Sequence, residues 1–252
     1  MKKFLFLFLL ISSFLNAQTT DELFQKANAL YQESNYFEAI ETYKKIEANN
    51  EISSELYYNL GNCYYKLNKV APTIYNYEKA LKLNPLNQDA ANNLVFAKRL
   101  TIDNIEEVPK SFLQKFNKNY LQKLSYNQWA VIAVLFSFMV AILFLLFYFS
   151  NTPSKKRFFF TTSIICFLFL IVSLFITFNQ YNLEKNTIEA IVFAEKTEVK
   201  NAPTVNSEDV FTLHEGTKVF VLDEVDDWKK IKLADGKIGW ILSERIKVFS
   251  IF

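Results

Sequence analysis

The sequence predicts a multidomain membrane protein that combines an all-α repeat array, a transmembrane helical hairpin and an all-β C-terminal domain. Three observations predict this fold class. Two uncharged apolar segments near the middle of the chain are each long enough to cross a bilayer, which takes roughly 20 helical residues. Before them, similar residues recur at a fixed interval. After them, apolar residues alternate with polar ones, which is typical of strands.

The composition of the 252-residue chain excludes several classes of protein. Its net charge is only +2 and its basic residues form no extended stripe, so we do not expect a nucleic-acid partner. The two cysteines, Cys63 in a soluble stretch and Cys166 in an apolar segment, face different environments and cannot pair. We therefore predict two buried thiols, no disulfide framework, no metal site and no cofactor.

Residues 1–17 have the three parts of a secretory signal peptide. Lys2 and Lys3 supply a positive start, Phe4–Ile11 forms a short apolar core, and Ala17 is a small residue suited to a cleavage site. The alternative is an uncleaved membrane anchor, for which the apolar run is short. The segment predicts that the residues after it start outside the cytoplasm.

Residues 18–104 are predicted to form a helical repeat domain. Tyr43 and Tyr77 lie 34 residues apart, as do other aromatic and small positions, and this is the period of tetratricopeptide repeats. The second copy carries the small Gly61 where two helices cross, and a proline stops its second helix. Residues 89–100 keep the register without a second helix and are predicted to be a capping helix. These features resemble the tetratricopeptide family, which implies an array of stacked helix pairs.

The tetratricopeptide resemblance also implies a function, since such arrays bind peptides along a concave groove lined by their first helices. Asparagine amides suit this role because they can donate and accept hydrogen bonds with a peptide backbone at once. The alternative is that the tyrosines among these positions only pack the helices together. Carried over by position, the peptide-binding residues are Phe24, Asn28, Tyr31, Tyr58, Asn59, Asn62, Tyr65, Asn92 and Arg99.

Residues 105–128 are predicted to be an amphipathic connector. Its lysines lie largely away from a helical face that is formed by apolar residues, namely Phe112, Leu113, Phe116, Tyr120 and Leu124. This pattern suits a helix that lies on the outer leaflet of a membrane. The alternative is a helix that packs on the last repeat.

Residues 129–149 and 158–178 are predicted to be transmembrane helices 1 and 2. Residues 150–157 between them end in a basic run, so the positive-inside rule makes this loop cytoplasmic. The domains before and after the hairpin then both lie on the periplasmic side of the bacterial inner membrane. The rule does not favour the lysines that precede the first span on that side, which are Lys110, Lys115, Lys118 and Lys123.

Residues 186–252 are predicted to form a small all-β domain. Asp235-Gly236 predicts a hairpin turn, because both residues tolerate the left-handed backbone that such a turn requires. Four runs of alternating polarity are predicted strands: Glu189–Ala194, Thr217–Leu222, Trp228–Leu233 and Lys237–Leu242.

The motifs Leu213–Val219, Asp227–Ile231 and Asp235–Ile241 resemble the bacterial SH3-like barrel family, in which some members bind cell-wall peptides. Trp228 and Trp240 are predicted to lie in the core of this domain rather than to form a ligand platform. The single histidine of the chain, His214, has no nearby cysteine or acidic residue in a catalytic pattern and is predicted to be a surface residue rather than a catalyst.

The sequence predicts no enzyme. No Ser/His/Asp set, Cys–His pair, phosphate-binding loop or metal-ligand cluster appears, so we assign no catalytic residue. The spans carry no charge on which a proton relay or an ion pathway would depend, and this argues against transport.

The order of the segments, together with the stretch Lys98–Pro109 after the capping helix, resembles the BatE family of the Bat aerotolerance operons over nearly the whole chain. The resemblance implies a non-enzymatic inner-membrane scaffold that acts under oxidative stress with other Bat proteins, several of which carry von Willebrand A-type domains. The alternative is an envelope sensor or anchor that binds peptidoglycan through its SH3-like domain.

Overall fold

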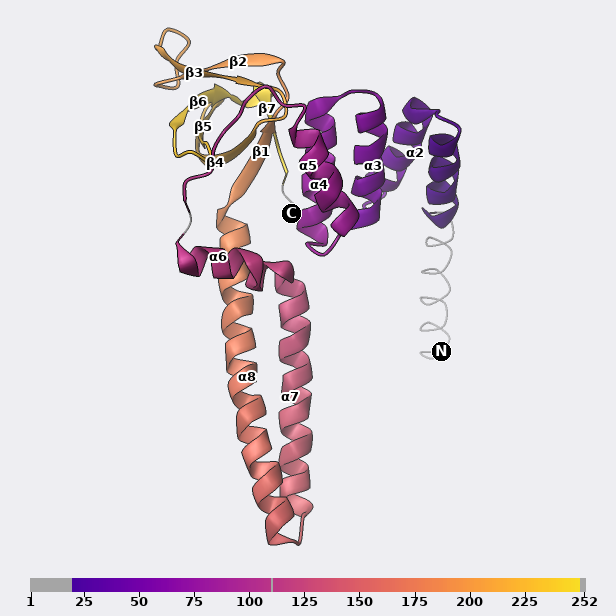
Figure 1. Cartoon of the computed structure of the whole chain (residues 1–252), viewed down its shortest axis with the longest axis vertical. Helices are drawn as coiled ribbons and strands as arrows, with labels where there is room; N and C mark the ends of the chain where they lie inside the picture. The colour runs from indigo at the N-terminus through magenta and orange to yellow at the C-terminus, as the bar shows by residue number, and fades with distance from the viewer. Residues whose placement is uncertain (1–19, 110, 250–252) are drawn as a thin grey trace, which may run out of the picture. The chain divides into compact units, whose positions relative to one another are not determined.

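The computed structural model describes residues 20–109 and 111–249 (Figure 1). The predicted signal peptide, residues 1–17, lies outside the described residues. The chain divides into two compact units, of which Met1–Val108 and Glu189–Phe252 form the first and Pro109–Ile188 forms the second. The first unit therefore joins chain segments from both sides of the apolar stretch.

Helices make up the N-terminal part of the first unit. Sequence positions that recur at the repeat period cap them: the side chain of Ser53 accepts a hydrogen bond from Leu56 N, and that of Asn87 accepts one from Ala90 N. Such caps satisfy amides at helix starts that have no partner within the helix. The helices span residues 20–32, α2 Tyr36–Ala48, α3 Ser54–Lys66, α4 Val70–Leu83 and α5 Gln88–Lys98.

The helices pack closely where the sequence has a small residue. A Cβ atom added to Gly61 on α3 would lie only 2.5 Å from the ring of Tyr77 on α4. Ala27 and Ala39 are fully buried in a core cluster that extends from the first helix to α5. Interior packing of proteins is dense, so larger side chains at these points would force the helices apart.

The C-terminal part of the first unit is an antiparallel sheet. Its strand order is β3-β2-β6-β5-β4-β1-β7, which leaves β3 and β7 at the two edges. The sequence did not predict β2, β3 or β7. The strands are β1 Ile188–Val192, β2 Lys196–Lys200, β3 Asp209–His214, β4 Lys218–Val225, β5 Trp228–Lys232, β6 Ile238–Leu242 and β7 Ile246–Val248.

The sheet and the last helices of the array share a hydrophobic core. Tyr75 on α4 makes edge-on ring contacts with Phe193 and Phe249, at centroid distances of 5.7 and 6.0 Å. Leu94 of α5 and Ile191 of β1 belong to the same buried cluster. The end of the helical array is therefore covered by the sheet as well as by α5.

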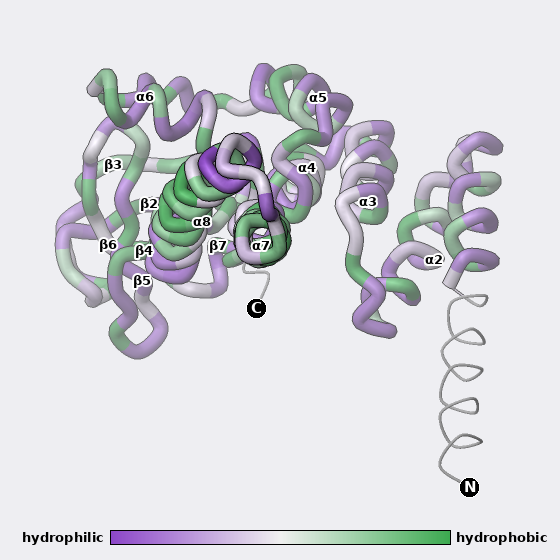
Figure 2. The backbone as a smooth tube through the Cα atoms, turned by 90° about the horizontal axis from the view of Figure 1, so that it is seen from below, coloured by the Kyte–Doolittle hydropathy of each residue, from purple (hydrophilic) through white to green (hydrophobic). Residues whose placement is uncertain are grey.

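The second unit contains two helices that are long and apolar enough to cross a membrane. Helix α7, Tyr126–Phe149, and helix α8, Pro153–Asn186, run side by side, and the rings of Phe136 and Phe169 stack at 5.6 Å (Figure 1). Figure 2 shows hydrophobic residues along both helices and hydrophilic residues at the turn that joins them. Most of their large apolar side chains are exposed, which is costly in water and favourable in lipid.

Two short helices precede this pair: α6, Phe112–Asn119, and η1, Leu121–Lys123. Ser111 and Gln114 form a capping box at the start of α6, and Ser125 and Gln128 form another at the start of α7. Pro153 stands at the first turn of α8, where its missing N–H costs nothing.

Candidate functional site

A repeated hydrogen-bond unit links the first helices of the array. The side-chain oxygen of Asn28 accepts hydrogen bonds from the hydroxyl of Tyr43 and, at 3.2 Å, from the amide of Asn59. One repeat later, the oxygen of Asn62 accepts from Tyr77 at 2.6 Å and from Asn93 at 3.0 Å. The same two hydrogen bonds therefore recur at the period of the sequence.

These hydrogen bonds determine which atoms of the predicted groove asparagines are available to a ligand. An amide oxygen has two lone pairs, and those of Asn28 and Asn62 are both engaged within the array. These oxygens therefore hold helices together, and only the amide N–H groups are available to a ligand. We call the hydrogen-bonded residues Asn28, Asn59, Asn62 and Asn93 the asparagine ladder. Sequence reasoning chose Asn92 on the last helix, whereas Asn93 belongs to the ladder. The signal that identifies Asn93 is its 34-residue spacing from Asn59.

The predicted tyrosines divide into partly buried and exposed side chains. Tyr31 contacts Tyr36 edge-on at 5.4 Å, and burial raises the pKa of Tyr31 above its usual value. Tyr58 is likewise half-buried and lies 6.1 Å from the ring of Tyr77. Tyr65, which follows Tyr31 at the repeat period, is 38% exposed. Of these side chains, that of Tyr65 is the most accessible to a partner.

Two predicted residues lie on α5 or at its end, and both are exposed. Asn92 is exposed, and the hydrogen bond to Asn62 comes from its neighbour Asn93 instead. Arg99 follows the helix, and its guanidinium lies 5.2 Å from the ring centre of Phe96. Together with Tyr65, these residues offer an aromatic ring, an amide and a cation outside the ladder.

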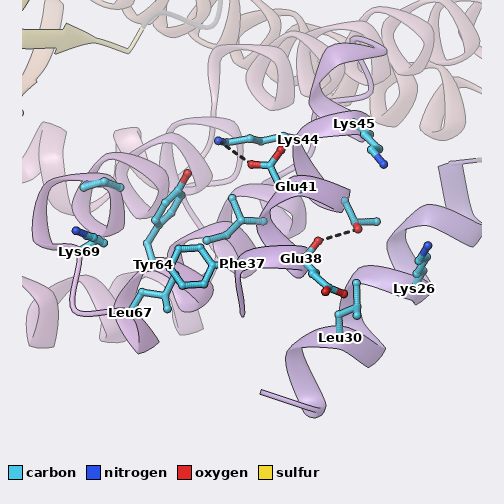
Figure 3. A pocket seen from close by; sticks show the side chains of 13 residues that line it. Lys26, Leu30, Phe37, Glu38, Glu41, Lys44, Lys45, Tyr64, Leu67 and Lys69 are labelled. Atoms are coloured by element: carbon cyan, nitrogen blue, oxygen red, sulfur yellow. Dashed lines mark hydrogen bonds and ion pairs between the residues drawn. The ribbon is translucent and has the colours of Figure 1, made fainter. Parts of the chain in front are cut away.

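A separate cavity of about 650 Å³ lies elsewhere on the helical array (Figure 3). Its lining comes from the helix over 20–32, α2, α3 and α4, and includes none of the predicted peptide-binding residues. Phe37, which is 70% exposed, Leu67 and Tyr64 give it an apolar surface, and Lys26 and Lys69 stand among its charged residues. Sequence reasoning missed this surface, because the exposure of Phe37 is visible only in the structure.

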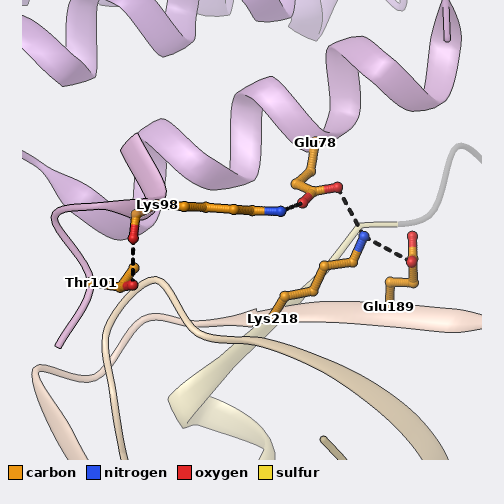
Figure 4. A network of polar contacts seen from close by, with 5 residues as sticks. All are labelled: Glu78, Lys98, Thr101, Glu189 and Lys218. Atoms are coloured by element: carbon orange, nitrogen blue, oxygen red, sulfur yellow. Dashed lines mark hydrogen bonds and ion pairs between the residues drawn. The ribbon is translucent and has the colours of Figure 1, made fainter. Parts of the chain in front are cut away.

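A charged cluster lies where α4 meets the sheet (Figure 4). The carboxylate of buried Glu78 is 2.8 Å from the ammonium groups of both Lys98 and Lys218, and Lys218 is also 2.8 Å from Glu189. Burial disfavours the charged form of Glu78, but the two lysines outweigh it and lower its pKa to about 2. The carboxylate is therefore charged at neutral pH and holds a strand to a helix.

A second polar contact joins the segment after α5 to the sheet. Asp103 accepts hydrogen bonds from the backbone N–H of His214 at 2.7 Å and from the hydroxyl of Thr217. The Nδ1 atom of His214 lies 2.7 Å from the other carboxylate oxygen. Burial raises the pKa of Asp103, but the bonds from Thr217 and His214 outweigh this and lower it overall.

The prediction that His214 is a simple surface residue is wrong. Its side chain is partly buried against Asp103, and the next residue, Glu215, accepts a 3.4 Å hydrogen bond from Ala71 N in the first turn of α4. A carboxylate is favoured there because helix N-termini carry partial positive charge. Asp103 and His214 lie 111 residues apart in sequence, so local sequence patterns gave no sign of the contact.

The two predicted core tryptophans of the sheet differ. Trp228 is buried, as predicted, whereas Trp240 is half-buried with the ammonium of Lys230 5.8 Å from its ring. Both cysteines are free and buried, as the sequence indicated, and burial raises the pKa of Cys63 to about 12. Within residues 20–109 and 111–249, no group of three or more His, Cys, Asp or Glu side chains is suited to a metal ion.

Two parts of the chain match known protein families. Residues 54–87, which span α3 and α4, match the model for the tetratricopeptide repeat, and residues 196–247, which span β2 to β7, match that for the bacterial SH3 domain. No curated protein matches the chain. Both families are typically non-catalytic binding domains, the first for proteins and the second of a peptidoglycan-binding type. The matches therefore support an adaptor role.

Proposed function

We propose that this chain is a non-enzymatic scaffold of the bacterial inner membrane that acts in a Bat-type aerotolerance complex. Its partners are other Bat proteins with von Willebrand A-type domains, and it binds them through the helical array on the periplasmic side. The proposal combines the BatE-like order of segments with the two family matches.

The observation that carries the proposal is that two separate segments of the chain make up the first unit. Residues 20–108 and 189–249 pack together although two long apolar helices separate them in sequence. Segments that fold together must lie in one compartment, so the chain between them crosses a membrane an even number of times. Two spans meet this condition. The signal sequence of residues 1–17 and the basic residues at 155–157 then favour a periplasmic unit and a cytoplasmic turn.

The exposed side chains of the predicted groove are suited to a protein partner. Tyrosine and arginine are enriched among residues that dominate binding energy at protein interfaces, and Tyr65 and Arg99 are both accessible. Asn28 and Asn62, whose oxygens are engaged, contribute mainly by keeping the first helices in register.

The test is binding of a purified von Willebrand A-type domain from a Bat protein to the full-length chain in detergent. Tyr65→Ala is expected to weaken binding by about 2 kcal/mol, which is roughly thirtyfold. The matched control is Phe37→Ala, which removes an exposed aromatic ring from the separate cavity and leaves affinity unchanged. Loss of binding in Phe37→Ala alone would assign recognition to the cavity, and no binding by the wild type would refute the Bat partnership.

A second candidate function is an envelope anchor that holds peptidoglycan through the sheet. Two observations favour it: the match to the bacterial SH3 domain and the half-exposed ring of Trp240 beside Lys230. Retention of the full-length chain on purified sacculi, lost in Trp240→Ala, would support this function. The scaffold proposal predicts no retention in either protein.

A further inference from the structure

The short helix α6 carries an exposed apolar stripe. Phe112 and Leu113 are 80% and 76% exposed, and the rings of Phe116 and Tyr120 stack at 5.0 Å next to them along the same helical face. No residue of α6 is buried. By helical periodicity Lys118 lies on the opposite side of the helix, and Lys115 borders the stripe next to Phe112. Such a stripe is costly in water, so something apolar must cover it.

The chain just after α6 is fixed to both long helices. The carbonyl oxygen of Leu121 in η1 accepts hydrogen bonds from the indole N–H of Trp129 at 2.9 Å and from the amide of Gln180 at 2.6 Å. Trp129 belongs to α7, whereas Gln180 belongs to α8 and is buried. One carbonyl therefore joins η1 to both helices. The rings of Tyr126 and Tyr181 meet edge-on at 5.7 Å at the same end.

This anchoring determines where α6 lies. Figure 1 shows α6 across the end of the α7–α8 pair that is opposite the turn joining them. Tryptophan and tyrosine concentrate at the boundary between hydrocarbon and headgroups, and Trp129, Tyr126 and Tyr181 mark that level here. A helix fixed at this level, with one apolar and one basic side, has the composition of an in-plane interfacial helix.

We propose that α6 lies in the surface of the bilayer, with its apolar stripe at the hydrocarbon boundary and its lysines among anionic headgroups. The proposal rests on membrane insertion of α7 and α8, which is part of the proposed function. It also accounts for Lys115 and Lys118 of α6 on the periplasmic side, where the positive-inside rule does not favour them. Lysines in an in-plane helix bind headgroups and need not be retained in the cytoplasm.

The experiment uses nitroxide labels on the full-length chain in nanodiscs of phosphatidylcholine and phosphatidylglycerol. Leu113→Cys places a label on the apolar stripe, Lys118→Cys places one on the basic side, and Phe138→Cys places one on the exposed surface of α7. Accessibility of each label is measured to oxygen, which partitions into lipid, and to a water-soluble nickel chelate. The unlabelled background is the wild-type chain, in which Cys63 and Cys166 are both buried.

The proposal predicts that the label at Leu113 is several-fold more accessible to oxygen and several-fold less accessible to nickel than the label at Lys118. Equal nickel accessibility at Leu113 and Lys118, with a shielded label at Phe138, would overturn the proposal and leave membrane insertion intact. A label at Leu113 shielded from both reagents would also overturn it, because that result means a protein partner covers the stripe. Nickel access at Phe138 would refute both the proposal and the membrane anchor.

Discussion

The carboxylate of Glu78 on α4 lies 2.8 Å from the ammonium of Lys218 on β4, although 140 residues and both apolar helices separate the two in sequence. The pair is largely buried, and each partner has a second opposite charge, Lys98 for Glu78 and Glu189 for Lys218. Buried charges are stable only when they are paired and hydrogen-bonded. The helical array and the sheet therefore form one body, and each completes the charge balance of the other.

Glu78→Gln is expected to destabilise the first unit by about 3 kcal/mol, because it removes the buried negative charge that Lys98 and Lys218 share and leaves Lys218 with Glu189 alone. The thermal midpoint of the full-length chain in detergent, followed by near-UV circular dichroism, should fall by roughly 6 to 12 °C. Glu41→Gln is the matched control, since its pair with Lys44 is exposed, and it should change stability by less than about 0.5 kcal/mol. Equal shifts in the two variants would mean that the buried pair does not stabilise the unit.

Stability should fall in acid because of Glu78 and Asp103. The folded-state pKa of Glu78 is about 2, below its ordinary value of 4.5, and that of Asp103 is also lowered. Groups of this kind stabilise the fold above their unfolded pKa, and the contribution is lost as the pH falls toward the folded pKa. The melting midpoint should be constant down to about pH 4.5 and fall steeply toward pH 2, with a gentler fall in Glu78→Gln. An acid profile identical in the wild type and the variant would contradict this assignment.

Alanine substitutions at two glycines distinguish the cost of backbone strain from the cost of disturbed packing between the array and the sheet. Gly216 and Gly236 both have positive φ angles, 85° and 96°, so alanine at either costs roughly 1 kcal/mol. A Cβ atom at Gly216 would also lie 2.8 Å from Thr101 and 3.0 Å from Ile74, whereas at Gly236 the nearest atom is 4.0 Å away. Gly216→Ala should therefore destabilise the chain by roughly 1 to 3 kcal/mol more than Gly236→Ala in chemical denaturation. Equal losses would show that Gly216 does not lie in a packed interface.

The asparagine ladder predicts that alanine substitutions at Asn62 and Asn92 have unequal effects on stability. Asn62→Ala removes the acceptor of both the Tyr77 hydroxyl and the Asn93 amide, so it should destabilise the chain by about 1 to 3 kcal/mol. Asn92→Ala alters an exposed side chain outside the ladder and should stay within about 0.5 kcal/mol of the wild type. The comparison is again made by chemical denaturation. A larger loss in Asn92→Ala would reverse the assignment of roles.

Features with a local cause could be predicted from the sequence. Repeat spacing, small residues such as Gly61 and the start of strand β5 at Trp228 follow from patterns within a few residues. The long helices exceed the apolar runs, because caps rather than hydrophobicity decide where they begin: Ser125 starts α7, and α8 begins at Pro153.

Features that depend on distant contacts could not be predicted. Strand β2, Lys-Thr-Glu-Val-Lys, has Val199 as its only buried residue, and β7 is only three residues long, so neither carries a clear strand pattern. The bonds of Asp103 with His214 and Thr217 depend on the packing of the sheet against the array. In the candidate groove, the repeat register located the residues, but the hydrogen bonds that occupy the asparagine oxygens became visible only in the structure.

The helical array and the sheet form one unit, which we propose lies outside the cytoplasm and is joined to the membrane by the α7–α8 hairpin. The most direct test is a pair of alkaline phosphatase fusions, since this enzyme is active only when it is exported. A fusion after Phe252 is expected to be active, and a fusion after Asn151, in the turn between α7 and α8, is expected to be inactive. An inactive enzyme after Phe252, or an active one after Asn151, would contradict the account.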